Sequence, residues 1–186
     1  MTQVTLIRLF WLVIFFAIAL FALMSGSYSV DFLGLAAVLG LFLIALSWID
    51  IETYRLPDWL TLPLIVLGIG QAITFEFVPL NESLIGAVLG YGIFWLIGTV
   101  YFRARGFEGL GLGDAKLLAA GGAWAGAVAL SPIVLISCLF AIPLALLNRS
   151  ETSKGKVAFG PWLAIGIWTA WWLGHGLEVI PVTLAV

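Results

Sequence analysis

The sequence predicts an all-α integral membrane protein, a bundle of about seven transmembrane helices, and three observations support this prediction. Of its 186 residues, 63% are hydrophobic and only 10% are charged, so lipid rather than water is the expected solvent. The apolar residues fall in runs close to the roughly 20 residues that a helix needs to cross the hydrocarbon layer. Seven such spans also place every Lys and Arg residue on one side of the membrane.

The expected spans, in chain order, cover residues 4–24, 32–50, 59–76, 83–102, 114–129, 131–148 and 160–178. The first lacks a small-residue cleavage site and is long enough to cross the membrane, so we expect a retained helix rather than a removed signal peptide. Pro63 and Pro143 lie inside spans, which membrane helices tolerate when neighbouring groups satisfy the freed carbonyls. The other prolines within this range lie at or near junctions, where proline is expected: Pro57, Pro79, Pro132 and Pro161. We expect residues 1–186 to form a single domain.

The basic residues orient the predicted bundle. With seven spans, all eight Lys and Arg residues fall on the same side: Arg8, Arg55, Arg103, Arg105, Lys116, Arg149, Lys154 and Lys156. The positive-inside rule then predicts a cytoplasmic N-terminus and an external C-terminus. Another number of spans would scatter these charges, so their one-sided distribution also supports the count.

The composition argues against several kinds of partner and cofactor. A net charge of −2 gives no electrostatic footprint for nucleic acid. One cysteine, Cys138, and one histidine, His175, cannot form a metal-binding cluster or an internal disulfide. We therefore expect no nucleic-acid partner, no metal and no cofactor.

Two aspartates are the candidate catalytic residues. Asp50 ends the apolar run "LGLFLIALSWI" of the second span, and Asp114 follows the spaced glycines of "GLGLGDAKLL" at the start of the fifth. In the predicted topology both lie at the cytoplasmic depth on different helices, where ionisable groups usually mark a function. Two carboxyls about 3 Å apart share one proton. The ionised carboxyl can activate water and the protonated one can polarise a peptide carbonyl, which is aspartic peptide hydrolysis.

Each acidic residue also has a simpler interpretation. Asp50 can be an interfacial carboxylate that headgroups and water solvate. Asp58 lies where the N-cap of the third span is expected. Asp114 can cap a helix as well, although a cap does not need glycines before it. Gly111 and Gly113 instead leave the backbone free to lie close to an extended peptide.

Three stretches resemble a known family. "WIDIETYRLPDWLTLPL" and "GLGLGDAKLLAAGGAWAG" together resemble the type IV prepilin peptidases, or leader peptidases, which are membrane aspartic proteases with a G-x-G-D motif. Here that motif is residues 111–114, and "FGPWLA" (159–164) is similar to the start of the family's last helix. The resemblance covers about residues 5–178. It implies that Asp50 and Asp114 form the catalytic pair, at the cytoplasmic face of the bacterial inner membrane.

The resemblance also implies the substrates, which are type IV prepilins or type II secretion pseudopilins. Such substrates have a short basic leader, a glycine before the cut and then a hydrophobic helix. An acidic rim of Glu52, Asp58 and Glu108 can attract a basic leader, although Glu52 can also simply pair with Arg55. Lys116 occupies the matching "GDxK" position, and its simplest role is to snorkel toward headgroups.

Many members of this family carry paired CxxC zinc motifs near the N-terminus together with N-methyltransferase activity. This chain enters its first expected span by about residue 5 and has a single cysteine. It therefore resembles a short form without that segment, and we expect peptidase activity without N-methylation.

Other functions stay open at this stage. A proton- or ion-coupled transporter can use membrane carboxylates, although transporters usually place them near the midplane, with repeat symmetry. A non-catalytic partner of a pilus or secretion assembly, or another G-x-G-D protease with different substrates, is also compatible with the sequence. If the pair is catalytic, the dipoles of the second and fifth spans favour the shared proton on Asp50, with Asp114 as the base.

Overall fold

The computed structural model describes residues 29–106, 111–147 and 158–176, and within these ranges all regular structure is α-helical. The helices are, in chain order, α2 (Val30–Thr53), α3 (Asp58–Thr74), α4 (Leu80–Arg105), α5 (Leu112–Ala125), α6 (Leu130–Leu147) and α7 (Gly160–Gly176). They correspond to the second to seventh expected spans, with each end within four residues of the prediction. The first expected span, 4–24, lies outside the described residues.

Local signals in the sequence set several of the helix ends. α2 begins at the N-cap Ser29, whose Oγ accepts a hydrogen bond from the backbone N–H three residues later (3.2 Å). It ends at Tyr54, which has a left-handed φ of 53°. α4 ends at Gly106 (φ 74°) and α5 at Gly126 (φ 85°), because glycine adopts positive φ without strain. Gly126 therefore ends the fifth helix four residues earlier than expected.

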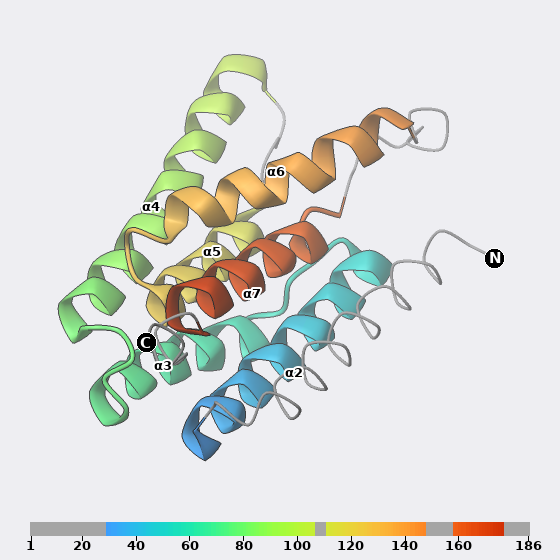
Figure 1. Cartoon of the computed structure of the whole chain (residues 1–186). Coiled ribbons are helices and arrows are strands. Elements are labelled where there is room, and N and C mark those ends of the chain that lie inside the picture. Colours follow the sequence, from blue (N-terminus) through green and yellow to red (C-terminus); the bar gives the residue numbers. More distant parts are fainter. Residues whose placement is uncertain (1–28, 107–110, 148–157, 177–186) are drawn as a thin grey trace, which may run out of the picture.

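The centre of the bundle is α5, which contacts α3, α4, α6 and α7 (Figure 1). The stretch from Leu117 to Trp124 is buried throughout. Small residues make this central position possible, because they let helix backbones approach closely. A Cβ added at Gly86 of α4 would lie 2.8 Å from the carbonyl carbon of Gly122, and one added at Gly121 would lie 2.7 Å from Cγ1 of Ile167 in α7.

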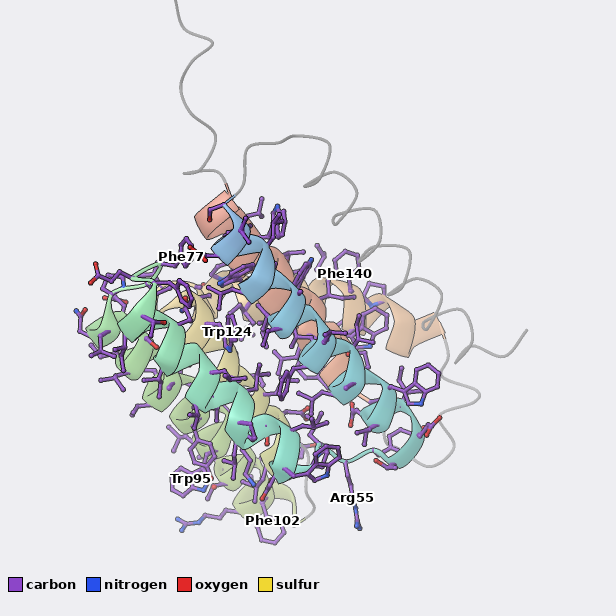
Figure 2. All side chains as sticks on the ribbon, turned by 90° about the horizontal axis from the view of Figure 1, so that it is seen from below. Arg55, Phe77, Trp95, Phe102, Trp124 and Phe140 are labelled. Carbon is purple, nitrogen blue, oxygen red and sulfur yellow. The ribbon has the colours of Figure 1, made fainter. Side chains whose placement is uncertain are left out.

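Trp124 joins α5 to α3. Its indole is fully buried, and Nε1 donates a hydrogen bond to the carbonyl oxygen of Leu64 (2.9 Å). Gly68 of α3 leaves room for this ring, because a Cβ there would lie 2.6 Å from Cδ1 of Trp124. Figure 2 shows Trp124 near the middle of the bundle.

The outer surface of the described bundle is strongly apolar. Large apolar side chains on its helices are about two-thirds exposed or more: Val66, Val88, Leu135 and Leu139. By length and composition, α2 and α4 can each cross a membrane, whereas α3 and α6 are apolar but shorter. This apolar surface and these helices are consistent with a membrane protein.

Both ends of the bundle can be identified in Figure 2. Arg55, between α2 and α3, and Phe102, near the end of α4, lie at one end, and Phe77, between α3 and α4, lies at the other. We call the first end the Arg55 end. It holds the C-terminal turns of α2 and α4 and the N-terminal turns of α3, α5 and α7, since contacts described below join these segments.

Candidate active site

Asp50 is a buried carboxylate at the junction of α2 and α7. It lies in the last turn of α2, and only 5% of its surface is exposed. Its Oδ2 accepts a hydrogen bond from the backbone N–H of Gly160, the first residue of α7 (2.9 Å). The first N–H groups of a helix have no partner within the helix, and Pro161 has none to offer. The start of α7 thus directs one backbone donor at the Asp50 carboxylate.

Space requires glycine at position 160, whereas any residue except proline could donate the backbone hydrogen bond. A Cβ added there would lie 2.7 Å from Oδ2 and 3.2 Å from Cβ of Asp50. No side chain fits in that space unless Asp50 moves. The sequence had identified the "FGPW" stretch only by resemblance, and its contact with a residue 110 positions away was not predicted.

Asp114 lies in the first turn of α5 and is half-buried. The charge of Asp50 acts on it, so the two carboxyls lie on different helices within electrostatic range of each other. Gly111 precedes it at the N-cap and is exposed, with a hypothetical Cβ 3.4 Å from Oδ2 of Asp114. The structure therefore brings together the two aspartates that the sequence selected.

Gly113 has a different role from the expected one. A Cβ added there would lie 2.8 Å from Cβ of Leu56, in the connection between α2 and α3. This close approach brings the start of α5 against the connection that follows α2, and so brings Asp114 toward Asp50. Gly113 thus makes room for a neighbouring segment of the same chain, whereas Gly111 stays open to an approaching molecule.

Asp58 and Lys116 form an ion pair. Asp58 is the first residue of α3, and Pro57 occupies the N-cap without any side-chain hydrogen bond, so the predicted capping role of Asp58 is wrong. Its Oδ1 lies 2.5 Å from Nζ of Lys116 in the first turns of α5. The interpretation of Lys116 as a snorkelling lysine stays a prediction, to which the structure adds this ion pair. The pair links α3 to α5 two residues after Asp114.

The expected acidic rim is only partly described by the structure. Glu52 is exposed near the end of α2, and Asp58 is exposed but has Lys116 beside it. The positive charge of Lys116 weakens any attraction of Asp58 for a basic peptide. Glu108 lies outside the described residues.

One further polar group near Asp50 was missed by the sequence analysis. Ser47 lies one turn before Asp50, on the same face of α2, and only 2% of its surface is exposed. Its Oγ has no hydrogen-bond partner among the residues that the structure describes. A hydroxyl three residues from a carboxylate in an otherwise apolar helix was the available signal.

The dipole argument for the shared proton needs revision. The last turn of α2 and the first turn of α5 are both helical, as that argument required. However, the N-terminus of α7 also faces Asp50, and its dipole opposes that of the α2 C-terminus. Helix dipoles alone therefore no longer assign the proton to either aspartate, and its placement on Asp50 stays a prediction.

The chemistry available at this site is that of two neighbouring carboxyls. Within residues 29–106, 111–147 and 158–176, no group of three or more His, Cys, Asp or Glu side chains could hold a metal ion. A pair of carboxyls that shares a proton can act as base and acid toward a water molecule and a carbonyl group.

Comparison with known proteins gives a consistent family match. A sequence model of the "Type IV leader peptidase family" matches residues 37–146, a range that contains both aspartates. No solved structure matches the chain.

Several curated proteins named "Prepilin leader peptidase/N-methyltransferase" are similar to the chain. The protein of Neisseria gonorrhoeae is 40% identical over 170 residues, which cover 84% of this chain and 59% of that protein. The protein of Pectobacterium carotovorum is 45% identical over 135 residues, 70% of this chain and 48% of that protein. The protein of Escherichia coli K12 is 44% identical over 127 residues, 67% of this chain and 56% of that protein. The chain thus spans about half the length of these relatives.

Proposed function

The chain belongs to the type IV leader peptidase family, and on this premise we propose that it is a membrane aspartic endopeptidase. Its substrates would be type IV prepilins or type II secretion pseudopilins, from which it removes the short basic leader. The observation that carries the proposal is that Asp50 and Asp114 lie within electrostatic range of each other at one end of an apolar bundle, within the range that matches the family.

In the proposed mechanism, the two carboxyls share one proton before the substrate binds. The ionised carboxyl takes a proton from water as the water oxygen attacks the scissile carbonyl carbon. The protonated carboxyl stabilises the developing negative charge on the carbonyl oxygen by hydrogen bonding. A proton is then delivered to the amide nitrogen, and the C–N bond breaks. Because Oδ2 of Asp50 already accepts the Gly160 N–H, Oδ1 is left for the water or the shared proton.

The proposal places the aspartate pair at the cytoplasmic face of the bacterial inner membrane. The described connection that carries Arg55 and the end of α4 that carries Arg103 lie at the same end of the bundle as both aspartates. The positive-inside rule favours the cytoplasm for such an end. We further propose seven spans, with a cytoplasmic N-terminus and an external C-terminus, in a single peptidase domain. A transporter function has less support, since these carboxyls lie at helix ends rather than at mid-helix.

The proposal predicts that cleavage depends on both aspartates. The full chain, reconstituted in liposomes, would be mixed with a type IV prepilin, and leader removal followed by gel mobility and mass spectrometry. Asp50→Asn and Asp114→Asn should each slow cleavage by roughly 10²–10⁴-fold, because each removes the acid–base pair. Asp31→Asn is the matched control, because Asp31 is exposed in the first turn of α2, away from the pair.

The outcomes separate mechanism from substrate. Normal cleavage by either pair variant would rule out the aspartic mechanism. A wild-type protein that is folded but inactive on prepilins and pseudopilins would rule out the proposed substrates. With a methyl donor such as S-adenosylmethionine added to the reaction, the mass of the mature product also tests the expectation that its new N-terminus is not methylated.

A further inference from the structure

A groove of about 340 Å³ lies between the C-terminal half of α4 and the start of α5. It is within the size range of sites that bind small organic groups. Phe94 lies at its buried side, with 6% of its surface exposed, while Trp95, Phe102 and Leu112 are about half exposed around it. Figure 2 shows Trp95 and Phe102 on the part of α4 toward the Arg55 end.

The groove follows from one row of residues along α4. Residues 86, 90, 94, 98 and 102 recur every fourth position, so each lies beside the next in a row that winds slowly around the helix. Gly86 and Gly90 allow backbone contact with α5, and a Cβ added at Gly90 would lie 2.6 Å from the carbonyl oxygen of Leu118. Phe94 is the first large side chain in this row. Gly98, the next residue of the row, has no side chain and lines the groove.

The groove is continuous with the candidate active site. Gly111 lines the groove, and its hypothetical Cβ lies only 3.4 Å from Oδ2 of Asp114. On the other side, the ring of Phe94 packs against Phe159, with ring centroids 6.3 Å apart, and Phe159 directly precedes the Gly160 that binds Asp50. A chain lying in the groove would therefore pass beside Asp114, and Phe94 joins the groove to the segment that holds Asp50.

The lining of the groove selects an apolar occupant. Three aromatic rings and a leucine line it, and no charged side chain does so among the described residues. Its one hydroxyl, that of Thr99, already donates a hydrogen bond to the carbonyl oxygen of Trp95 (2.8 Å). Among these described residues a basic leader peptide finds no charged partner, so its charges would lose water there without compensation.

We propose that this groove binds the apolar residues that directly follow the cleaved bond of the substrate. The inference rests on the proposed function, whose substrates carry a hydrophobic segment after the cut. The scissile bond then lies at the aspartates, the apolar segment enters between α4 and α5, and the basic leader stays outside the groove. Gly98 makes the groove available and sets its capacity.

The proposal is tested by placing a larger side chain in the groove and then supplying a substrate with smaller residues after the cut. Gly98→Leu should raise the KM for a prepilin by roughly tenfold or more with a smaller change in kcat, since the added side chain occupies the substrate's place. A substrate with alanine at its first positions after the cut should recover part of this loss. Gly92→Leu is the matched control, because a Cβ at Gly92 of the same helix meets nothing within 4 Å.

A second variant covers the case in which Gly98→Leu does not fold. Trp95→Ala should weaken cleavage of a substrate with large residues after the cut more than cleavage of one with alanine there. Phe140→Ala, on the exposed surface of α6, is its control.

The inference is overturned if Gly98→Leu or Trp95→Ala affects all substrates equally, as it would if a lipid chain fills the groove. It is also overturned if both variants cleave like wild type. In either case wild-type cleavage of prepilins still supports the proposed function. A wild-type protein that cleaves no prepilin overturns the proposed function itself, and the inference with it.

Discussion

The two halves of the contact between α4 and α5 are built in opposite ways. In the half away from the aspartates, Gly86 and Gly90 bring the two backbones together, so that no side chain separates them. In the half at the Arg55 end, Phe94 is followed by Gly98 and a groove opens. The closed half holds α5 in place, which lets its first turn carry Asp114 beside open space. Some turns of this pair of helices thus stabilise the bundle, and other turns leave open space beside Asp114.

The largest effect is expected at the Arg55 end, where Gly160→Ala should lower activity much more than stability. The added Cβ would displace the Asp50 carboxyl, since it would lie 2.7 Å from Oδ2. Misplacing a reacting group by about 1 Å can cost roughly a hundredfold in rate, so kcat should fall by about that factor. Stability should change much less. Single-turnover cleavage and thermal unfolding in detergent would measure the two effects.

Gly174→Ala is the control for Gly160→Ala on the same helix, because a Cβ at Gly174 meets nothing within 4 Å. Unchanged kcat in Gly160→Ala would mean that Gly160 does not position Asp50. A fall in activity that merely follows loss of folded protein would assign Gly160 a packing role alone.

The closed half should respond in the opposite way to Gly86→Ala. A Cβ there would lie 2.8 Å from the carbonyl carbon of Gly122, which is backbone and cannot move aside cheaply. Overpacking of this kind typically costs about 1–3 kcal/mol of unfolding free energy, while kcat of the folded fraction should stay near wild type. Unfolding in a denaturing detergent series would measure the change. Gly92→Ala should be neutral, and equal losses in both variants would contradict the closed-half assignment.

The smallest effect is expected for the ion pair between α3 and α5. Lys116→Met should lower stability by less than about 1 kcal/mol, because pairs this exposed contribute little. Cleavage should slow only a few-fold, through slight loosening of the turn that carries Asp114. The exchanged variant, Asp58→Lys with Lys116→Asp, should restore both properties, as measured by unfolding and initial rates.

A much larger loss of activity in Lys116→Met, without restoration in the exchanged variant, would contradict a positioning role. It would mean that the lysine contacts the substrate or the reacting groups directly.

The sequence predicted most of the helical framework, but fewer of the contacts at the site. The described helices begin and end close to the expected spans, because apolar runs and residues such as Ser29 and Gly106 act locally. Asp50 and Asp114 were selected because carboxyls are rare in apolar helices. The capping role of Asp58 was wrong, and the ion pair between Asp58 and Lys116 was not predicted. Both residues were judged one helix at a time, whereas their pairing depends on how α3 and α5 pack.

The sequence by itself determined the class of protein, the order of its described helices and the two candidate aspartates. Each of these follows from the free energy of placing a residue in lipid, or from backbone preferences within a few residues. Only the tertiary structure decided that Gly160 donates to Asp50, that Gly113 makes room for Leu56 and that a groove forms beside Gly98. These contacts join residues far apart in the chain. They depend on how closely helices approach, and no periodicity within a single helix encodes that distance.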